Sequence, residues 1–197
     1  MGRPNKTAER RKVLIPVITS VFAELGYRRA TTAELAKRCG VQENILYRLW
    51  PDKKAMYIAA IEYRYLLAAE LWTGLVKRSD SNTTPAERVL SYESEHYGEG
   101  GLYRIVFAGL NETDDPEVHE ALRDMYGRFH SFIRKQIAAH RDGAGKKSSP
   151  NAELSAWAFV GLGTVVNIGL ELGLLTDRQR RRLVADVGRV LLEGQMR

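Results

Sequence analysis

The hydrophobic positions of this chain recur at helical spacing almost throughout. The first clear stripe begins at Leu14 and ends at Leu25, just before Gly26, and it occupies every third or fourth position. Similar stripes cover residues 118–137 and 183–191. No segment of the sequence alternates between apolar and polar residues as a half-buried strand does. The pattern therefore predicts an all-α chain.

The stretch from Thr31 to Lys54 predicts two short helices joined by a tight turn, followed by a longer helix. Thr31 can cap the first helix, and Glu34, three residues later, can complete a capping box. Gly40 lies where this helix must end, because glycine adopts the left-handed backbone at little cost. Asp52 can cap the longer helix. Two short helices joined in this way form the helix-turn-helix pattern, which places a recognition helix in the major groove of DNA.

The remainder of the chain predicts a bundle of further helices. Polar or glycine-rich stretches separate them, and Thr176 can cap the last one. The expected helices cover residues 52–72, 86–97, 102–110, 115–137, 151–172 and 177–193.

Positive charge is concentrated in the first quarter of the chain. Residues 1–54 hold 12 Lys and Arg against 5 Asp and Glu, whereas residues 55–197 hold 18 against 19. This imbalance predicts that the first quarter alone binds a polyanion. We therefore expect two domains, a helix-turn-helix DNA-binding domain with a basic arm at residues 1–54 and a separate helical body at residues 55–197.

The basic arm before the first helix is expected to be disordered in the isolated protein. Residues 2–6 and 10–12 offer no apolar side chain to anchor them. Beside a recognition helix, such an arm usually lies on phosphates or in the adjacent minor groove. Arg3 and Lys6 are the arm residues expected to contact DNA, and a solubilising tail is the alternative interpretation.

A dense set of short motifs lies in and around the helix-turn-helix stretch. These motifs are Gly26-Tyr27, Thr31-Thr32, Leu35-Ala36, Cys39-Gly40-Val41, Ile45-Leu46-Tyr47 and Trp50-Pro51-Asp52-Lys53. Together they resemble the N-terminal signature of TetR-family transcriptional regulators. Four positions differ from that signature: Gln42 replaces the usual small hydroxyl cap, Asn44 replaces a common glycine, and Leu49-Trp50 replaces a His-Phe pair. The first difference predicts a weaker cap on the recognition helix.

The second short helix carries the side chains expected to read the bases. Gln42 and Asn44 can present an amide edge to adenine, and Glu43 can accept a hydrogen bond from cytosine. Arg48 can reach guanine or phosphate, and Ile45 can contact a thymine methyl group. The alternative is that these residues form the solvated face of a small helix.

Four further side chains are expected at DNA phosphates. The resemblance implies this role, because they look like the family's phosphate-contacting positions: Thr31, Thr32, Tyr47 and Lys53.

The helix expected at residues 151–172 carries small or apolar side chains on nearly all sides, so it must be buried on most of them. A second copy of the chain is the natural partner, and the resemblance implies the same pairing through the last two helices. The expected homodimer interface contains Ala156, Gly161, Val165, Gly169, Leu183, Val187 and Val190.

The longest uncharged run, Leu154 to Leu170, has 17 residues, which is the lower limit for a membrane span. Its Asn167 and its glycines favour a soluble bundle, so no membrane partner is expected.

The single cysteine, Cys39, excludes an intramolecular disulfide and fits a reducing compartment. We expect Cys39 to lie on the inner face of its helix, where its side chain has a packing role. The apolar run after the basic N-terminus contains Pro16 and follows a helical stripe, which argues against a signal peptide. A cytoplasmic protein is therefore expected.

The sequence gives little support to catalysis or metal binding. His119 and His130 are 11 residues apart, or about 16 Å along a helix axis, so one metal ion does not join them. The zinc pattern that begins at His119 fails because Arg123 occupies the second histidine position. A dinucleotide loop would require a third glycine three residues after Gly163, where Val166 stands, and a strand before Gly161, where none is predicted. We expect no catalytic residue, no metal and no cofactor.

The resemblance implies an effector pocket among the middle helices of the body. Phe107, Tyr126 and Phe129 are expected to line it and to suit a small hydrophobic ligand. The body, residues 55–197, is thus expected to be an effector-binding and dimerisation domain.

The expected function is sequence-specific regulation of transcription. A homodimer would bind a palindromic operator on double-stranded DNA, with recognition helices about 34–36 Å apart, and a small-molecule effector would release it. Repression is the expected outcome, and activation is left open. A non-specific nucleic-acid binder is the closest alternative; an enzyme built on the helical body and a membrane-anchored protein are the others.

Overall fold

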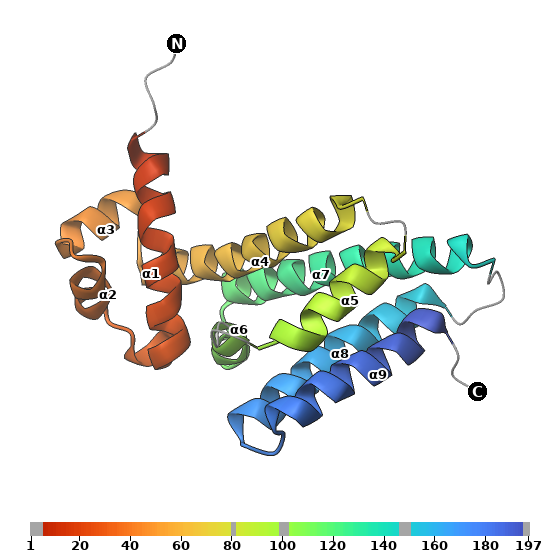
Figure 1. Ribbon diagram of the computed structural model, residues 1–197. Helices are drawn as coiled ribbons and strands as arrows, with labels where there is room; N and C mark the ends of the chain where they lie inside the picture. The colour runs from red at the N-terminus through yellow and green to blue at the C-terminus, as the bar shows by residue number, and fades with distance from the viewer. Residues whose placement is uncertain (1–5, 80–81, 99–102, 146–150, 195–197) are drawn as a thin grey trace, which may run out of the picture. The chain divides into compact units, whose positions relative to one another are not determined.

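The computed structural model describes residues 6–79, 82–98, 103–145 and 151–194. Within these ranges the chain forms helices joined by short connections, with no strand, as predicted (Figure 1). The helices are α1 (Lys6–Arg29), α2 (Thr32–Cys39), α3 (Glu43–Leu49), α4 (Lys53–Lys77), α5 (Pro85–His96), α6 (Tyr103–Leu110), α7 (Pro116–Gly143), α8 (Ala152–Glu171) and α9 (Asp177–Glu193).

The helices begin where the sequence places capping residues. The Thr31 hydroxyl accepts from the Glu34 N–H at 3.2 Å, and the Asp52 carboxylate accepts from the Ala55 N–H at 2.7 Å. Thr176 caps α9 in a complete capping box. The capping box predicted at Thr31 is only half formed, because the Glu34 carboxylate instead accepts from the Arg38 guanidinium at 2.8 Å. Helix starts are therefore set by local hydrogen bonds.

The basic segment before the first apolar stripe is helical, which corrects the expectation that residues 10–12 are disordered. α1 begins at Lys6 and runs through Pro16, and its non-helical backbone angles lie at Gly26, with φ 73° and ψ 168°. Arg11 anchors the segment, because its Nε donates to the Leu49 carbonyl at 2.7 Å. Arg3 lies outside the described residues.

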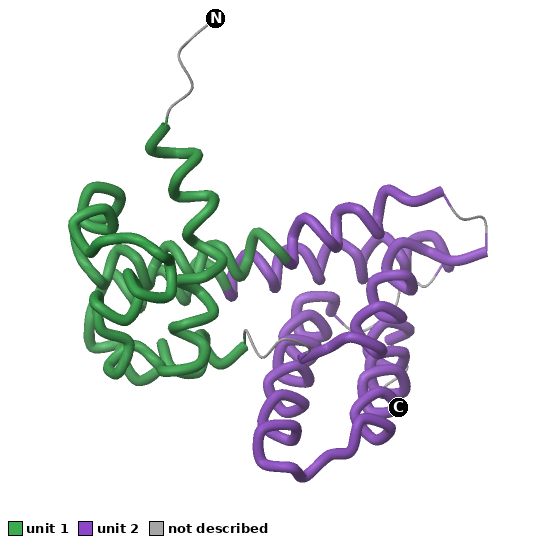
Figure 2. The backbone as a smooth tube through the Cα atoms, turned by 60° about the vertical axis from the view of Figure 1, so that its left-hand side comes forward, with its two compact units in different colours: residues 1–67, 100–125 green, residues 68–99, 126–197 purple. Residues whose placement is uncertain are grey.

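The chain divides into two compact units (Figure 2). The first contains residues 1–67 and 100–125, and the second contains residues 68–99 and 126–197. This division does not coincide with the predicted boundary at residue 54, because α6 and the start of α7 join the first unit. Aromatic packing accounts for the difference: Phe22 meets Tyr57 edge-on at 4.9 Å, and the Tyr57 hydroxyl donates to the Ile105 carbonyl at 2.7 Å.

In the second unit, α9 packs against both α5 and α8. Gly188 permits a close approach, because a Cβ added there would lie 2.4 Å from a Leu90 methyl group. A separate cluster forms around Trp72, whose ring lies 5.3 Å from Phe129 and 5.1 Å from Phe132. The second unit therefore has an apolar core of its own.

Two buried arginines close helix ends in the second unit. Arg141 donates to the Leu191 carbonyl at 2.7 Å and to the Leu192 carbonyl at 3.1 Å, both near the end of α9. Burial lowers the pKa of Arg141. Arg180, which is 3% exposed, donates to the carbonyls at the end of α5, at 3.4 Å (Ser94), 2.8 Å (Glu95) and 3.0 Å (Tyr97). These guanidinium groups satisfy carbonyls that a helix end leaves without an intrahelical partner.

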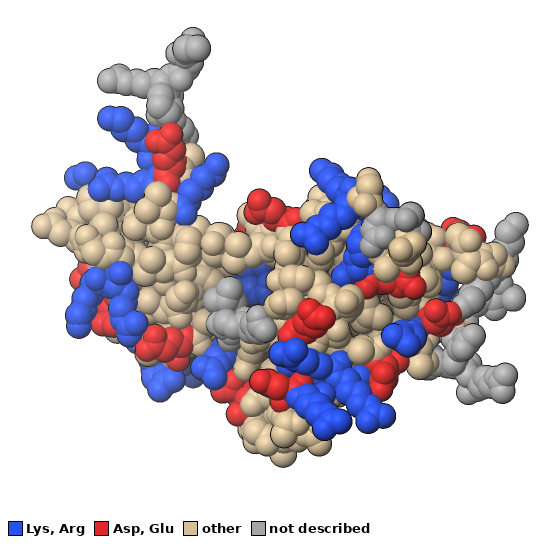
Figure 3. All heavy atoms as spheres, viewed as in Figure 1, with Lys and Arg blue, Asp and Glu red and all other residues tan. Residues whose placement is uncertain are grey.

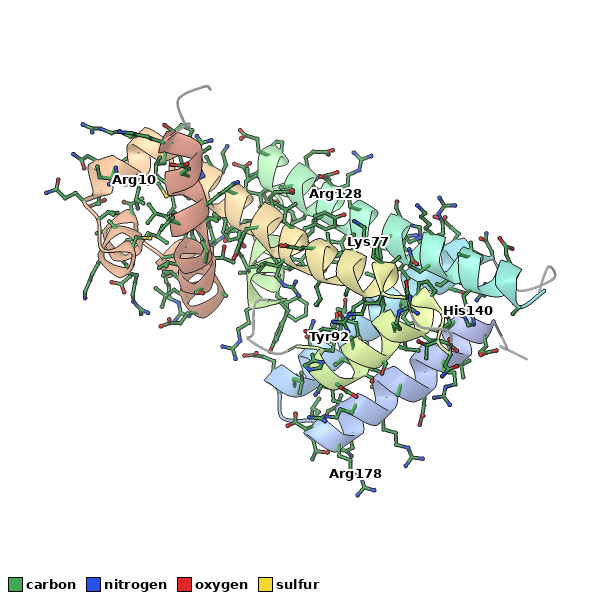
Figure 4. The ribbon with its side chains drawn as sticks, turned by 45° about the horizontal axis from the view of Figure 1, so that its top comes forward. Arg10, Lys77, Tyr92, Arg128, His140 and Arg178 are labelled. Atoms are coloured by element: carbon green, nitrogen blue, oxygen red, sulfur yellow. The ribbon has the colours of Figure 1, made fainter. Side chains whose placement is uncertain are left out.

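Replacement of Arg180 is expected to destabilise the protein strongly. Arg180→Ala should lower the free energy of unfolding by about 2–4 kcal/mol, because it leaves the carbonyls at the end of α5 without their donor. Chemical denaturation followed by circular dichroism measures the change. Arg178→Ala is the control, since Arg178 is exposed on α9 and points away from the helices (Figure 4), and should change stability by less than about 0.5 kcal/mol. Equal losses in the two variants would contradict the capping role.

Candidate nucleic-acid interface

α2 and α3 form a helix-turn-helix, and α1 packs against both helices. Leu35 of α2 and Leu46 of α3 are fully buried, so the inner faces of the two helices are fixed. Gly40 ends α2 in the left-handed region, with φ 65° and ψ 32°. Its N–H donates to the Lys37 carbonyl at 3.1 Å, which closes the turn that leads into α3.

The outer face of α3 presents most of the predicted base-reading residues to solvent. Gln42, Glu43, Asn44 and Arg48 are exposed, and Ile45 is half-buried. Gln42 occupies the N-cap position, where its side chain makes no capping hydrogen bond. The weaker cap predicted for this helix is thus confirmed, and the Gln42 amide is not engaged with the helix backbone.

Hydrogen bonds connect three of the predicted contact residues to one another. The Thr32 hydroxyl donates to the Glu43 carboxylate at 2.7 Å, and the Tyr47 hydroxyl donates to Thr32 Oγ1 at 3.3 Å. The Thr31 hydroxyl is engaged as the cap of α2. The start of α2 and the outer face of α3 therefore meet in a small polar cluster, which the sequence did not predict.

Lys53 is held within the protein. Its Nζ donates to the Tyr27 carbonyl at 3.0 Å and lies 4.4 Å from the centre of the Tyr27 ring. Burial raises the pKa of Tyr27, with Asp115 the next largest cause. Lys53 thus fastens the start of α4 to the segment that follows Gly26, and its contact with phosphate stays a prediction. Lys6, by contrast, is exposed at the start of α1.

Arg11 supports the end of the recognition helix and was not predicted to do so. Besides its Nε, its Nη2 also donates to the Leu49 carbonyl. The guanidinium carbon lies 5.9 Å from the centre of the Trp50 ring. From the sequence, Arg11 was placed in the basic arm. Its contact with Leu49 was missed because no local pattern connects residues 38 positions apart.

The connection between α6 and α7 is tied to the same unit by ion pairs. Lys54 Nζ lies 3.1 Å from the Asp115 carboxylate and 2.8 Å from that of Glu117, and Arg28 pairs with Glu112 at 2.9 Å. Hydrogen bonds to Glu117 and then Asp115 raise the pKa of Lys54, and the Lys54 bond lowers the pKa of Asp115. Such partly exposed pairs each contribute little to stability, but together they bring α6 and the start of α7 to the helix-turn-helix unit.

Lys and Arg side chains gather around the first turns of α1 and beside α2 (Figure 3). Among the described residues, no group of three or more His, Cys, Asp and Glu side chains is placed to hold a metal ion. The same part of the chain contains one helix, α8, with the length and hydropathy of a membrane span. A core helix of a soluble protein passes the same test, so this is weak evidence for a membrane.

Comparison with known proteins identifies the helix-turn-helix. Residues 14–60 match the family model for bacterial regulatory proteins of the tetR family. The chain is also 30% identical over 157 residues to the nucleoid occlusion factor SlmA of Pasteurella multocida, covering 74% of this chain and 76% of that protein. The chain belongs to the TetR family. It is accordingly a DNA-binding transcriptional regulator.

Solved structures of TetR-family regulators share this fold. A regulator from Cytophaga hutchinsonii aligns with a TM-score of 0.79 at 13% identity and covers 100% of both chains. A regulator from Rhodococcus sp. aligns with a TM-score of 0.76 at 16% identity, covering 94% of this chain and 99% of that chain. At these identities the likeness extends to the fold alone.

The residues expected to line an effector pocket fall in different units of this TetR-family regulator. Phe107 belongs to the first unit, where its ring packs edge-on against Tyr103 at 5.7 Å. Tyr126 and Phe129 belong to the second unit; burial raises the pKa of Tyr126, and Phe129 packs against Trp72. A hollow of about 270 Å³ is lined by other residues, among them Ala86 of α5 and His140 of α7, which Figure 4 labels. The pocket assignment therefore stays a prediction.

The expected dimer interface is corrected at two residues. Ala156 is fully buried in a cluster with Ile137 and Leu192, and Gly169 is covered by the Leu175 side chain. The protomer's own side chains make both residues inaccessible to a partner. The other five expected residues are exposed or half-buried: Gly161, Val165, Leu183, Val187 and Val190.

The structure adds exposed apolar residues on α8 that the sequence analysis did not select. With the exposed valines they form what we call the outer strip: Leu154, Trp157, Val165, Ile168, Leu172, Val187 and Val190. On α8 and its C-cap Leu172, these residues follow spacings of three, four and eight, so they share one face of the helix. The spacing was visible in the sequence, but it did not distinguish this face from the buried one, which is also apolar.

Asn44 allows base reading to be separated from phosphate binding. Asn44→Ala is expected to change the preferred DNA sequence while leaving stability within about 0.5 kcal/mol of the wild type, because the side chain is exposed. Selection of bound fragments from a random DNA pool measures the preference. Lys6→Ala is the comparison, and it should weaken binding to all sequences equally, as loss of a phosphate contact does. An unchanged preference in Asn44→Ala would remove this residue from the base-reading set.

Proposed function

We propose that this TetR-family protein is a cytoplasmic repressor that binds a palindromic operator as a homodimer. The observation that carries the proposal is the coexistence of an exposed helix-turn-helix and the outer strip within one chain. Several exposed apolar side chains on one face of a helix mark an interaction site. A two-fold axis through such a surface presents two identical helix-turn-helices to DNA, and this symmetry requires a palindromic site.

The recognition helices of the dimer are expected about 34–36 Å apart, so that both enter the major groove on one side of the duplex. Bound at a promoter, such a dimer would occlude it. Selection of genomic fragments by the purified protein tests this proposal, and the expected product is a small set of two-fold symmetric sites close to promoters. Equal affinity for the selected sites and for random DNA at fixed salt would contradict the proposal, because only the sequence-independent electrostatic contribution to affinity would then be present.

A second candidate function follows from the relatives named nucleoid occlusion factors. A protein that acts on the nucleoid as a whole would need many sites spread along the chromosome, whereas a regulator of one operon needs few. The same genomic selection separates the two functions by the number and position of the recovered sites.

The dimer is tested by placing a charge in the outer strip. Val165→Arg is expected to weaken dimerisation by about a hundredfold or more, because an unpaired guanidinium would be buried at the interface. Sedimentation equilibrium measures the dissociation constant, and operator affinity should fall with it. Leu110→Arg is the matched control, since Leu110 is about as exposed as Val165 (51% against 57%) but lies on α6, outside the strip. A Val165→Arg protein that remains dimeric and binds its operator normally would refute the assigned interface.

We also propose that a small hydrophobic effector releases the operator. The aromatic cluster around Trp72, which includes Phe129, supports an apolar ligand site in the second unit. An effector acts only through a difference in its affinity for the DNA-bound and free conformations.

Coupling between effector and operator must be reciprocal. A compound found by screening should lower operator affinity by the same factor by which operator DNA lowers the affinity of the compound. Phe129→Ala should weaken compound binding while leaving operator affinity in its absence unchanged. Titrations of each ligand in the presence of the other measure both factors. A compound that binds tightly without altering operator affinity is not the effector.

A further inference from the structure

Two hydroxyl groups at the edge of the recognition helix form a chain of hydrogen bonds that ends on one carboxylate. Tyr47 donates to Thr32 at 3.3 Å, and Thr32 donates to Glu43 Oε2 at 2.7 Å. The chain of donors therefore ends on an anionic oxygen, in a short charge-assisted hydrogen bond.

Glu43 is the one acidic residue in the sequence of α3. It lies in the first turn, four positions before Tyr47, so both side chains occupy the same face of the helix. Tyr47 remains 47% exposed, and Glu43 is also exposed. A carboxylate thus occupies the surface that a TetR-family regulator turns toward a polyanion.

Thr32, Tyr47 and Glu43 were expected to make two different kinds of contact with DNA. Thr32 and Tyr47 are expected at DNA phosphates, whereas Glu43 was expected to accept from cytosine. The geometry joins all three in one hydrogen-bonded group. A carboxylate and a phosphate both present anionic oxygens to hydroxyl donors.

We infer that Glu43 is an internal substitute for a DNA phosphate. In the DNA-free protein its carboxylate holds the Thr32 hydroxyl, and through Thr32 it holds the Tyr47 hydroxyl. When DNA binds, phosphate oxygens replace the Glu43 carboxylate as the acceptor of the Thr32 hydroxyl and Thr32 Oγ1 as the acceptor of the Tyr47 hydroxyl. Glu43 is thus an autoinhibitory residue that lowers affinity for every sequence, and it does not read bases. The inference rests on the proposed phosphate contacts of Thr32 and Tyr47.

Two costs of DNA binding follow from this arrangement. The Thr32–Glu43 hydrogen bond must break, and the Glu43 carboxylate must lie near phosphates of like charge. Neither cost depends on the identity of the bases, because both concern the sugar–phosphate backbone. Removal of the charge should therefore strengthen binding without altering the sequence preference.

The test is Glu43→Gln in the full-length protein, measured at fixed salt on a selected operator and on a random-sequence duplex. We expect binding about threefold to tenfold tighter on both DNAs, with an unchanged preferred sequence, because a neutral amide acceptor holds the Thr32 hydroxyl less strongly than a carboxylate does. Glu43→Ala, which removes the acceptor entirely, should change affinity in the same direction. A loss of operator affinity with an altered preference at one base pair would instead make Glu43 a base reader and overturn the inference.

Two controls separate the hydrogen-bonded group from general electrostatics. Glu9→Gln removes the same charge from an exposed position in the first turn of α1 and should give a smaller gain. Thr32→Val, combined with Glu43→Gln, should reduce the gain to about that of Glu9→Gln, because the released hydroxyl is then absent and only the removal of charge remains. An equal gain in Glu9→Gln, or a gain that is undiminished with Thr32→Val, would overturn the inference. Failure of the wild type to select any DNA would instead contradict the proposed operator binding.

Discussion

The DNA-binding surface depends on tertiary packing, because its two helices are too short to be stable alone. α2 has 8 residues and α3 has 7, whereas isolated helices below about 12–15 residues are marginal in water. Their positions are set by buried leucines on the inner face and by the Arg11 contact with the end of α3. The exposed side chains of α3 are thus oriented by packing on the inner face of the helix and by a hydrogen bond at its end.

The sequence predicted the helices well because the signals that start and end them are local. Asp52 and Thr176 each bond to an N–H three residues later, and Gly40 ends α2 with its own backbone angles. The division into units could not be predicted in the same way. It depends on contacts such as Tyr57 with Ile105 and Arg28 with Glu112, whose partners are 48 and 84 positions apart.

The candidate site shows the same limit at the level of side chains. Helical spacing correctly predicted that Asn44 and Arg48 are exposed. It did not predict that Glu43 accepts from Thr32, because that bond joins two different helices. For α8, the exposed face and the face buried by the protomer are both apolar, so composition does not distinguish them. Ala156 and Val165 were therefore grouped together, although only Val165 is exposed.

The environment of Cys39 has a chemical consequence for the protein. The thiol lies at the end of α2, directly before the turn, and burial raises its pKa. Since the thiolate is the form that attacks peroxides and disulfides, little of the reactive species is present near neutral pH. The DNA-binding unit should therefore tolerate oxidants that inactivate proteins with exposed, acidic thiols.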